Sequence, residues 1–555
     1  MMVGGYRAGA PWVWLVAAAL AVSLIAVAGL VVLIGARGLA HFWPQTVYTV
    51  TATDQDGSTQ LFHAQLRGQE EVSLAVLRAN QAAAFDGELG EEATLTRYRF
   101  QVVKPERFSG DFVLVLEPNL VERVAPRELA VIERFGAGVL YGRVVGIRVG
   151  PDTLSADAVS WPALRAALAR VTRLRTEAES LKFGAIDRIT ERLEALRLRE
   201  RGLNMRGEAA PQQRAEIAGE RAALRARARD LSEDLRALQR AMARDAIVVE
   251  LANGRPVTVD LASVARAYRP NALGPVQRLA FFAHSVWRFV AERPREANTA
   301  GGIFPAIFGT VMMVLLMTVF VAPFGILAAV YLREYARQDG ITRAIRIAVN
   351  NLAGVPSIVY GVFGLGFFVY GVGGTIDQLF FPEALPTPTF GSPGILWASL
   401  TLALLTVPVV IVATEEGLSR IPRSLREASM ALGATKAETL FRTVLPIASP
   451  AMLTGLILAV ARAAGEVAPL MLVGAVKLSR DLPIDGEPPF VHLERKFMHL
   501  GFHIYDVGFQ SPNAEAARPV VFATAFLLLS VIVVLNLTAI AIRQYLREKY
   551  RALEE

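Results

Sequence analysis

Two charged residues, Arg462 and Glu466, lie four positions apart in the otherwise apolar stretch ARAAGEVAPLMLVGAV, residues 461–476. A charged side chain at the centre of a bilayer costs roughly 2.5–3.5 kcal/mol on insertion scales. Residues four apart on a helix share a face, so the two side chains are expected to pair, and pairing removes much of this cost. The pair is therefore a candidate either for packing between spans or for the lining of a path through the membrane.

Beside such a path, Arg462 would offer a fork of N–H donors to a tetrahedral oxyanion, while Glu466 would keep the anion from binding too tightly to leave. We expect this translocation role, and a buried ion pair that only fixes packing remains the alternative. No catalytic residues and no metal site are predicted. The chain has no cysteine, and His492, His499 and His503 share one connection without a convincing ligand pattern.

The charged pair must be positioned by membrane spans, each of which needs about 20 mostly apolar residues. The first such run, Trp12 to Gly35, is longer than the apolar core of a signal peptide, so it is expected to be a retained anchor. Five more are predicted at about 302–331, 351–375, 393–414, 451–476 and 519–541. The sequence therefore predicts an α-helical polytopic membrane protein with six transmembrane helices.

Lysine and arginine are concentrated on one side of these spans. The link 333–346 has four arginines and the segment 415–442 has four arginines and one lysine, whereas the link 377–383 has neither. Basic residues favour the cytoplasmic side, so both termini are expected inside and the region 37–300 outside. The connection 477–518, with five basic and six acidic residues, is a mild exception.

The outer region 37–300 is expected to be a large α+β insertion. Short apolar runs bounded by glycine and proline predict a strand-rich part at 48–150. Apolar residues at three- and four-residue spacing predict an antiparallel helical hairpin within 162–245, which would be a solvated arm or a docking surface for another protein. A strand pair joined around Asn253-Gly254 is predicted at about 246–261.

The predicted spans also define the boundaries of the remaining segments of the chain. Residues 1–36 would form a cytoplasmic start with the first helix, residues 301–542 a five-helix core, and residues 543–555 a cytoplasmic tail. The core contains a cytoplasmic loop at 415–446, and this loop is the most informative part of the sequence.

Within the loop, the stretch EASMALGATKAETLFRTVLP covers residues 427–446. A short helix from Glu427 is expected to stop at Gly433, because glycine favours helix ends. A second helix can start near Thr435, with Glu438 three residues later as in a capping box. The small residues around Ser429 permit close approach by a partner, and an interfacial turn without a partner is the alternative.

This stretch resembles the EAA loop of ABC-importer permeases, which runs EAA, three residues, Gly, nine residues, Ile, one residue and Leu-Pro. Here Ser429 replaces the third residue of the pattern and Thr443 replaces the Ile. In that family the loop docks into a groove of a cytoplasmic ATPase and transmits its closure to the spans. The resemblance implies an ATPase-coupling loop made by Glu427, Ala428, Ser429, Gly433, Leu445 and Pro446.

Further segments are similar to phosphate-transporter permeases of the PstA type. They are GLAHFWP (38–44), EANTAGGIFPAIFGT (296–310), PFGILAAVYLREYA (323–336), NLAGVPSIVYGVFGLGFF (351–368) and ARAAGEVAPL (461–470). The resemblance implies a permease subunit of an ATP-driven importer of inorganic phosphate in the bacterial inner membrane. The implied partners are a second, related permease chain (a heterodimer), a dimer of a cytoplasmic ABC ATPase and a periplasmic phosphate-binding protein. The family's usual Thr beside Glu466 is Val467 here.

The sequence contains no GxxxxGK[ST], so the chain has no P-loop and is not expected to be an enzyme by itself. No cofactor is expected in this chain, and ATP and Mg²⁺ would be bound by the partner ATPase. Two other functions remain open: a permease for another oxyanion, such as sulfate or molybdate, and a membrane-anchored sensor or scaffold acting through the outer hairpin. The net charge of +7 is modest and does not favour nucleic-acid binding.

Overall fold

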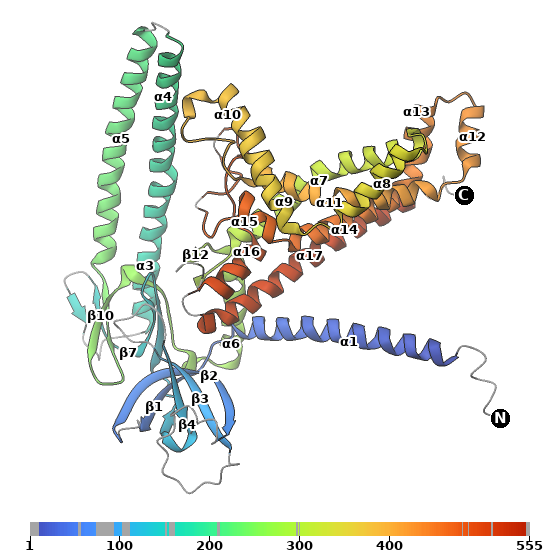
Figure 1. Ribbon diagram of the computed structural model, residues 1–555. Helices are drawn as coiled ribbons and strands as arrows, with labels where there is room; N and C mark the ends of the chain where they lie inside the picture. Colours follow the sequence, from blue (N-terminus) through green and yellow to red (C-terminus); the bar gives the residue numbers. More distant parts are fainter. Residues whose placement is uncertain are drawn as a thin grey trace, which may run out of the picture. The chain divides into compact units, whose positions relative to one another are not determined.

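The computed structural model describes residues 10–53, 57–73, 94–102, 111–149, 152–154, 161–207, 211–295, 298, 300–479, 481–486, 488–511 and 514–550. The chain divides into two compact units (Figure 1). The first, called the membrane unit below, comprises Met1–Phe42 and Trp287–Glu555, and the second, the outer unit, comprises Trp43–Val286.

Six helices within the described residues are long and apolar enough to cross a membrane, which confirms the predicted number. In chain order, spans one to six are Trp12–Ala40, Phe304–Tyr335, Ser357–Phe380, Ile395–Ser419, Lys436–Gly465 and Ala517–Glu548. They are built from α1 (Ala10–Ala40), α7 (Phe304–Val330), α9 (Ser357–Phe363) with α10 (Gly374–Phe380), α11 (Ile395–Ser419), α13 (Lys436–Thr439) with α14 (Leu445–Gly465), and α17 (Ala514–Tyr550).

The fifth span differs from its predicted position at 451–476. It begins at Lys436, inside the predicted cytoplasmic loop, and ends at Gly465. Its early start arises because a π-helical stretch, Leu440–Val444, joins α13 to α14 without a break. The prediction was wrong because it took Pro446 as the entry to the span, whereas the helix continues from the π-helical stretch directly through this proline.

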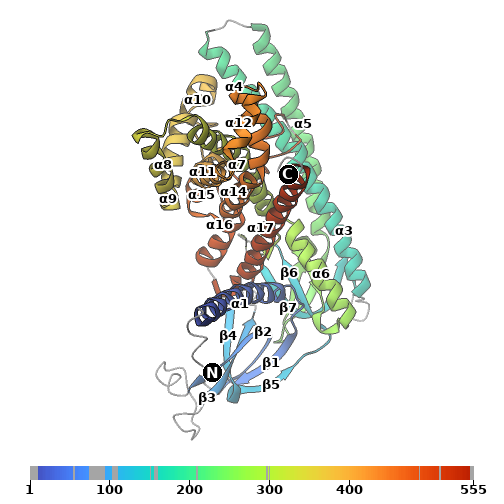
Figure 2. The same cartoon turned by 90° about the vertical axis from the view of Figure 1, so that its right-hand side faces the viewer.

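Helix α11 is the most buried span and lies against α7 and α14. Small residues bring α11 and α14 together: a Cβ on Gly455 would lie 2.6 Å from the Cβ of Ala413, and one on Gly417 would lie 2.5 Å from the Cβ of Ala451. Without a hydrophobic force between helices in lipid, such close backbone approach supplies the van der Waals contact that holds them. Figure 2 shows α11, α14 and α17 gathered in the membrane unit.

Short helices connect the spans. They are α8 (Gly340–Leu352), α12 (Arg423–Ala431), α15 (Ala468–Val473) and α16 (Leu500–Tyr505). The side chain of Asp339 caps α8 by accepting a hydrogen bond from the Thr342 N–H at 3.0 Å. This contact and backbone hydrogen bonds lower the pKa of the Asp339 carboxyl.

The outer unit contains two antiparallel sheets. The five-stranded sheet has the order β4-β3-β2-β1-β5, made by β1 (Val47–Thr53), β2 (Thr59–Ser73), β3 (Thr94–Val102), β4 (Asp111–Leu116) and β5 (Leu120–Val124). The second sheet has the order β10-β9-β7-β6-β11, with β8 beside β7, made by β6 (Leu129–Arg134), β7 (Gly138–Val149), β8 (Asp152–Leu154), β9 (Ala246–Glu250), β10 (Pro256–Asp260) and β11 (Val264–Tyr268).

A long helical hairpin extends from the second sheet (Figure 1). One arm is α3 (Trp161–Ser180) continued through a π-helical stretch into α4 (Asp187–Met205), and the other is α5 (Pro211–Ala243). Leu164 and Val171 of α3 are buried in one cluster with Ile132 and Ile247 of the sheet. Farther along, Leu196 lies in a separate small apolar cluster between the arms. The hairpin therefore confirms the predicted α+β character of the inserted region.

Helix α6 (Pro275–Ala291) was not predicted from the sequence. The ring of its Phe281 lies 4.6 Å from that of Tyr268 and 3.8 Å from the guanidinium carbon of Arg266.

Candidate functional site

The predicted coupling loop forms two short helices with a sharp turn between them. Helix α12 ends at Ala431 and is capped by Leu432, whose N–H donates to the Ala428 carbonyl at 3.1 Å. Gly433 follows with φ +91°, in the left-handed region that favours glycine. A Cβ on Gly433 would meet nothing within 4 Å, so backbone conformation and not crowding selects the glycine.

The second helix of the loop starts at the predicted capping box. The Thr435 hydroxyl accepts from the Glu438 N–H at 3.2 Å, and the Glu438 carboxylate accepts from the Thr435 N–H at 2.9 Å. These two bonds satisfy N–H groups that the first turn of a helix leaves open. Helix α13 continues into α14, so this turn lies at the start of the fifth span.

Glu334 lies at the end of the second span and anchors the coupling loop to that span. Arg426 of α12 donates to the Glu334 carboxylate at 2.9 Å and to the Leu418 carbonyl at 2.9 Å. Lys436 donates to the Glu334 carbonyl at 2.5 Å and lies 4.6 Å from the centre of the Tyr335 ring. Sequence reasoning missed these contacts because 92 residues separate Glu334 from Arg426.

The six residues predicted for coupling do not share one surface. Glu427, Ala428 and Gly433 are exposed, and Ser429 is half-buried. Leu445 and Pro446 begin α14 and are half-buried there. The exposed part of the loop also presents Leu432, which is 91% exposed, and Phe441. The loop thus offers a protruding apolar surface that the motif residues alone did not indicate.

Arg462 and Glu466 are brought together as predicted, but not along a continuous helix. The Arg462 Nε lies 3.4 Å from Glu466 Oε1, and the two side chains are 35% and 20% exposed. Helix α14 ends at Gly465, and Glu466 has extended backbone with φ −75° and ψ 135°. The pair therefore marks a break between α14 and α15. Ala463 and Ala464 beside it are fully buried.

The charged pair and the coupling loop occupy opposite ends of the fifth span. A helical segment of 30 residues, the length of Lys436–Gly465, extends for about 45 Å at 1.5 Å per residue. One continuous helical segment, long enough to cross a bilayer, thus joins a surface turn to a partly exposed arginine.

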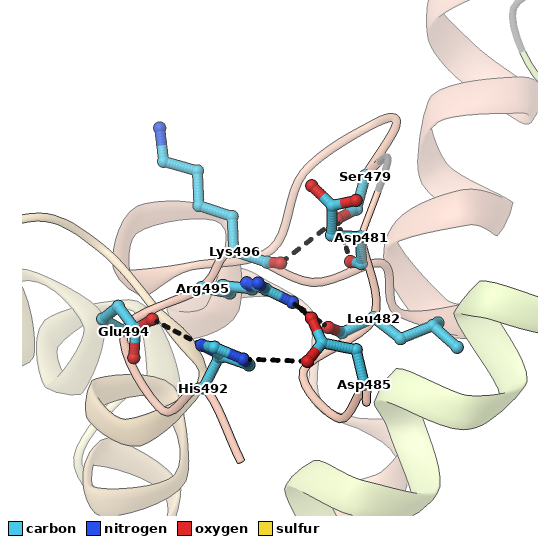
Figure 3. Close-up of polar contacts among 8 residues, drawn as sticks. All are labelled: Ser479, Asp481, Leu482, Asp485, His492, Glu494, Arg495 and Lys496. Carbon is cyan, nitrogen blue, oxygen red and sulfur yellow. Dashed lines mark hydrogen bonds and ion pairs between the residues drawn. The ribbon is translucent and has the colours of Figure 1, made fainter. Parts of the chain in front are cut away.

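The three histidines of the connection after the fifth span lie in different surroundings. His492 lies between Asp485 and Glu494, with ring nitrogens 3.0 Å and 3.2 Å from their carboxylate oxygens, and Arg495 pairs with the same Asp485 (Figure 3). His499 and His503 are buried elsewhere. Among the described residues, no group of three or more His, Cys, Asp or Glu could hold a metal ion.

Six apolar helices, a capped two-helix loop at the start of the fifth span and a helix break directly after it define a multi-pass membrane protein. Residues 321–552 match the family model described as "Binding-protein-dependent transport system inner membrane component". The chain is 32% identical over 268 residues to "Phosphate transport system permease protein PstA 1" of Mycobacterium tuberculosis (strain CDC 1551 / Oshkosh), covering 48% of this chain and 77% of the relative. The chain belongs to this family of inner-membrane permease subunits of ABC importers.

Another relative is the phosphate transport system permease protein PstA of Yersinia pestis, 37% identical over 184 residues, which are 33% of this chain and 56% of that protein. Among solved structures, the chain is similar to an inward-facing MetNI methionine ABC transporter, with 20% identity, a TM-score of 0.32, and coverage of 43% of this chain and 94% of that one. The family assignment depends on the sequence relatives and not on this structural likeness.

Proposed function

We propose that this chain is one half of the membrane pore of an ATP-driven importer of inorganic phosphate. The similarity to permeases named for phosphate transport supports the substrate, and the EAA-like loop supports coupling to an ATPase. A dimer of a separate ABC ATPase binds ATP and Mg²⁺ on the cytoplasmic side. A second, related permease completes the pore as a heterodimer, and a periplasmic binding protein delivers phosphate.

Coupling begins at the exposed surface of α12 and the turn after it. Glu427, Ala428 and Gly433, together with the protruding Leu432, dock into a groove of the ATPase. When the nucleotide sites close, the turn moves and carries α13 and α14 with it, because they form one span. The Arg426–Glu334 pair passes the same displacement to the end of the second span.

Anion translocation uses the break at the other end of the fifth span. Arg462 offers N–H donors to a phosphate oxygen, and its guanidinium is exposed enough to be reached. Glu466 Oε1 lies 3.4 Å from Arg462 Nε, so it occupies one of the arginine's donors, and its negative charge repels a second anion. Transport requires this balance, since an anion held too strongly does not leave.

The basic links support an orientation with both termini and the coupling loop in the cytoplasm. The region 37–300 then lies on the periplasmic side. Basic segments follow spans two, four and six, and in a chain that crosses the membrane six times these three segments lie on the same side.

The proposal depends most on one observation: the coupling turn leads directly into the helical span that bears Arg462. The test is to purify the complex from membranes, identify the subunits that accompany this chain, and measure ATP hydrolysis after reconstitution with the binding protein. Phosphate is expected to stimulate hydrolysis more than sulfate or molybdate does. Stronger stimulation by either of those anions would reassign the substrate, and recovery of the chain without an ATPase would favour a sensor or scaffold.

A further inference from the structure

A second basic site lies in the membrane unit, at the end of the spans that bears the coupling loop. It is a cavity of about 560 Å³ between the end of α11, the start of α14 and the end of α17. Its lining combines three arginines, Arg420, Arg543 and Arg547, with Thr454 and a set of apolar side chains. Figure 1 shows the C-terminal end of α17 at the same end of this unit as α12 and α13.

Three guanidinium groups from two elements converge on the cavity. Arg543 is held in place by a 3.1 Å hydrogen bond to the Thr454 hydroxyl. Arg420 pairs with Glu416 on the exposed surface, so its charge is partly balanced. Arg547 has no side-chain hydrogen bond or ion pair with any residue that the structure describes. The cavity thus keeps an excess of positive charge and unused N–H donors.

The remaining walls of the cavity are apolar. Ile421 and Leu425 form one side, and Ile447, Pro450 and Ala451 form the other. A free ion in water would gain nothing from these walls. A molecule with a charged head and a hydrocarbon body would place the head at the arginines and the body along the spans.

The cavity lies at the ends of two of the predicted spans. Arg420 follows directly after the fourth span, which ends at Ser419, and Arg543 lies in the last turns of the sixth span, which ends at Glu548. Basic pockets between transmembrane helices at this level suit the phosphates of anionic lipids.

We propose that this cavity binds the phosphate group of an anionic phospholipid, with Arg543 and Arg547 as its principal donors. Guanidinium forks form paired hydrogen bonds with phosphate oxygens, and the apolar walls accommodate the glycerol and the first acyl carbons. Inorganic phosphate shares the charged part of this chemistry but not the apolar part. The proposal does not depend on the transported substrate, because Arg462 and Glu466 do not line the cavity.

The test measures ligand retained by the full chain, purified with its accompanying subunits and placed in nanodiscs. The probes are labelled phosphatidylglycerol, labelled phosphatidylcholine and inorganic [³²P]phosphate. In the double variant Arg543→Gln/Arg547→Gln, retention of phosphatidylglycerol is expected to fall roughly 30-fold, from the loss of two surface arginines near an anionic lipid. Retention of phosphatidylcholine is expected to stay at its low background level.

Two variants serve as controls. Arg343→Gln removes an exposed arginine of α8 that does not line the cavity, so it should retain phosphatidylglycerol as the wild type does. Arg543→Lys/Arg547→Lys keeps the charge and should retain most of the lipid, which separates loss of the site from misfolding. Loss of [³²P]phosphate without loss of lipid in the Gln variant would overturn the assignment to a phospholipid and identify a free anion as the ligand. Equal retention of every probe by the Gln variant and the wild type would overturn the proposal.

Discussion

The hydroxyls of Ser429 and Thr439 lie 2.9 Å apart and join the two helices of the coupling loop. Thr439 is buried, whereas Ser429 is half-buried at the surface that the partner is proposed to contact. Ser429 is also one of the two positions, with Thr443, at which the sequence departs from the EAA pattern. The departure therefore adds an internal hydrogen bond that an alanine could not make.

Ser429→Ala tests whether this hydrogen bond matters for coupling. We expect a loss of about 1 kcal/mol in local stability, because one partner of a neutral hydrogen bond is removed. Uptake is expected to stay within about twofold of the wild type, since alanine fits the family pattern. Hydrogen exchange of α13 and an uptake assay measure the two effects, and abolished uptake would show that Ser429 itself contacts the ATPase.

Gly433→Ala is expected to weaken association with the ATPase. A residue with a Cβ at φ +91° carries strain of about 1–3 kcal/mol, so the turn between α12 and α13 would relax to another conformation. Gly340→Ala is the matched control, because Gly340 is also exposed with nothing near its Cβ but has no positive φ. Co-purified ATPase is measured for both variants, and equal loss in the two would argue against a role for the turn.

Breaking the ion pair between Arg426 and Glu334 is expected to uncouple ATP hydrolysis from uptake. The side chains are only 17% and 14% exposed, so Glu334→Gln leaves a poorly solvated guanidinium and is expected to cost about 1–3 kcal/mol. A double-mutant cycle with Arg426→Gln, followed by thermal unfolding in detergent, measures the coupling energy. A value near zero would mean that the loop is anchored by Lys436 and backbone contacts instead.

Arg462→Gln is expected to lower uptake at least tenfold while the protein stays in the membrane. The substitution removes the anion's donor and leaves Glu466 without its ion-pair partner. Arg343→Gln, an exposed arginine on α8, should transport normally. Uptake is compared with the amount of membrane-inserted protein, and normal uptake by the Arg462 variant would leave the pair with a packing role only.

Stability is expected to fall as the pH drops below about 6.5. Burial lowers the pKa of His499 to about 3, and burial lowers that of His503 to about 4 against the opposing effect of Asp506. An unfolded histidine titrates near 6.5, so the unfolded state binds more protons between about pH 6.5 and 4. The stabilisation is therefore complete above pH 6.5 and is lost on acidification, by up to about 1.4 kcal/mol per pH unit for each histidine.

His499→Asn checks this pH dependence. The His499 ring accepts from the Gly501 N–H at the start of α16, and asparagine can replace it as a helix cap. The melting temperature of the variant should decline less between pH 7.5 and 5.5 than that of the wild type. Parallel curves for the two proteins would assign the acid sensitivity to other groups.

Local signals in the sequence were sufficient for much of the fold. The six spans, the turn at Asn253-Gly254 between β9 and β10, and the capping box at Thr435 and Glu438 all depend on residues close together in the chain. Helix α6 and the early start of the fifth span were missed. The fifth span was misplaced because Pro446 was taken as its entry, although the helix continues through this proline.

The sequence by itself determined which residues carry charge into an apolar stretch and which stretch forms the coupling turn. Only the tertiary structure decided that Glu466 leaves the helix yet still reaches Arg462, and that Glu334 anchors the loop. The physical reason is the distance along the chain between the residues that interact. Caps, turns and apolar runs are determined by neighbours within a few residues. A helix break, a distant ion pair or a cavity between three spans depends on contacts between segments that only the folded chain brings together.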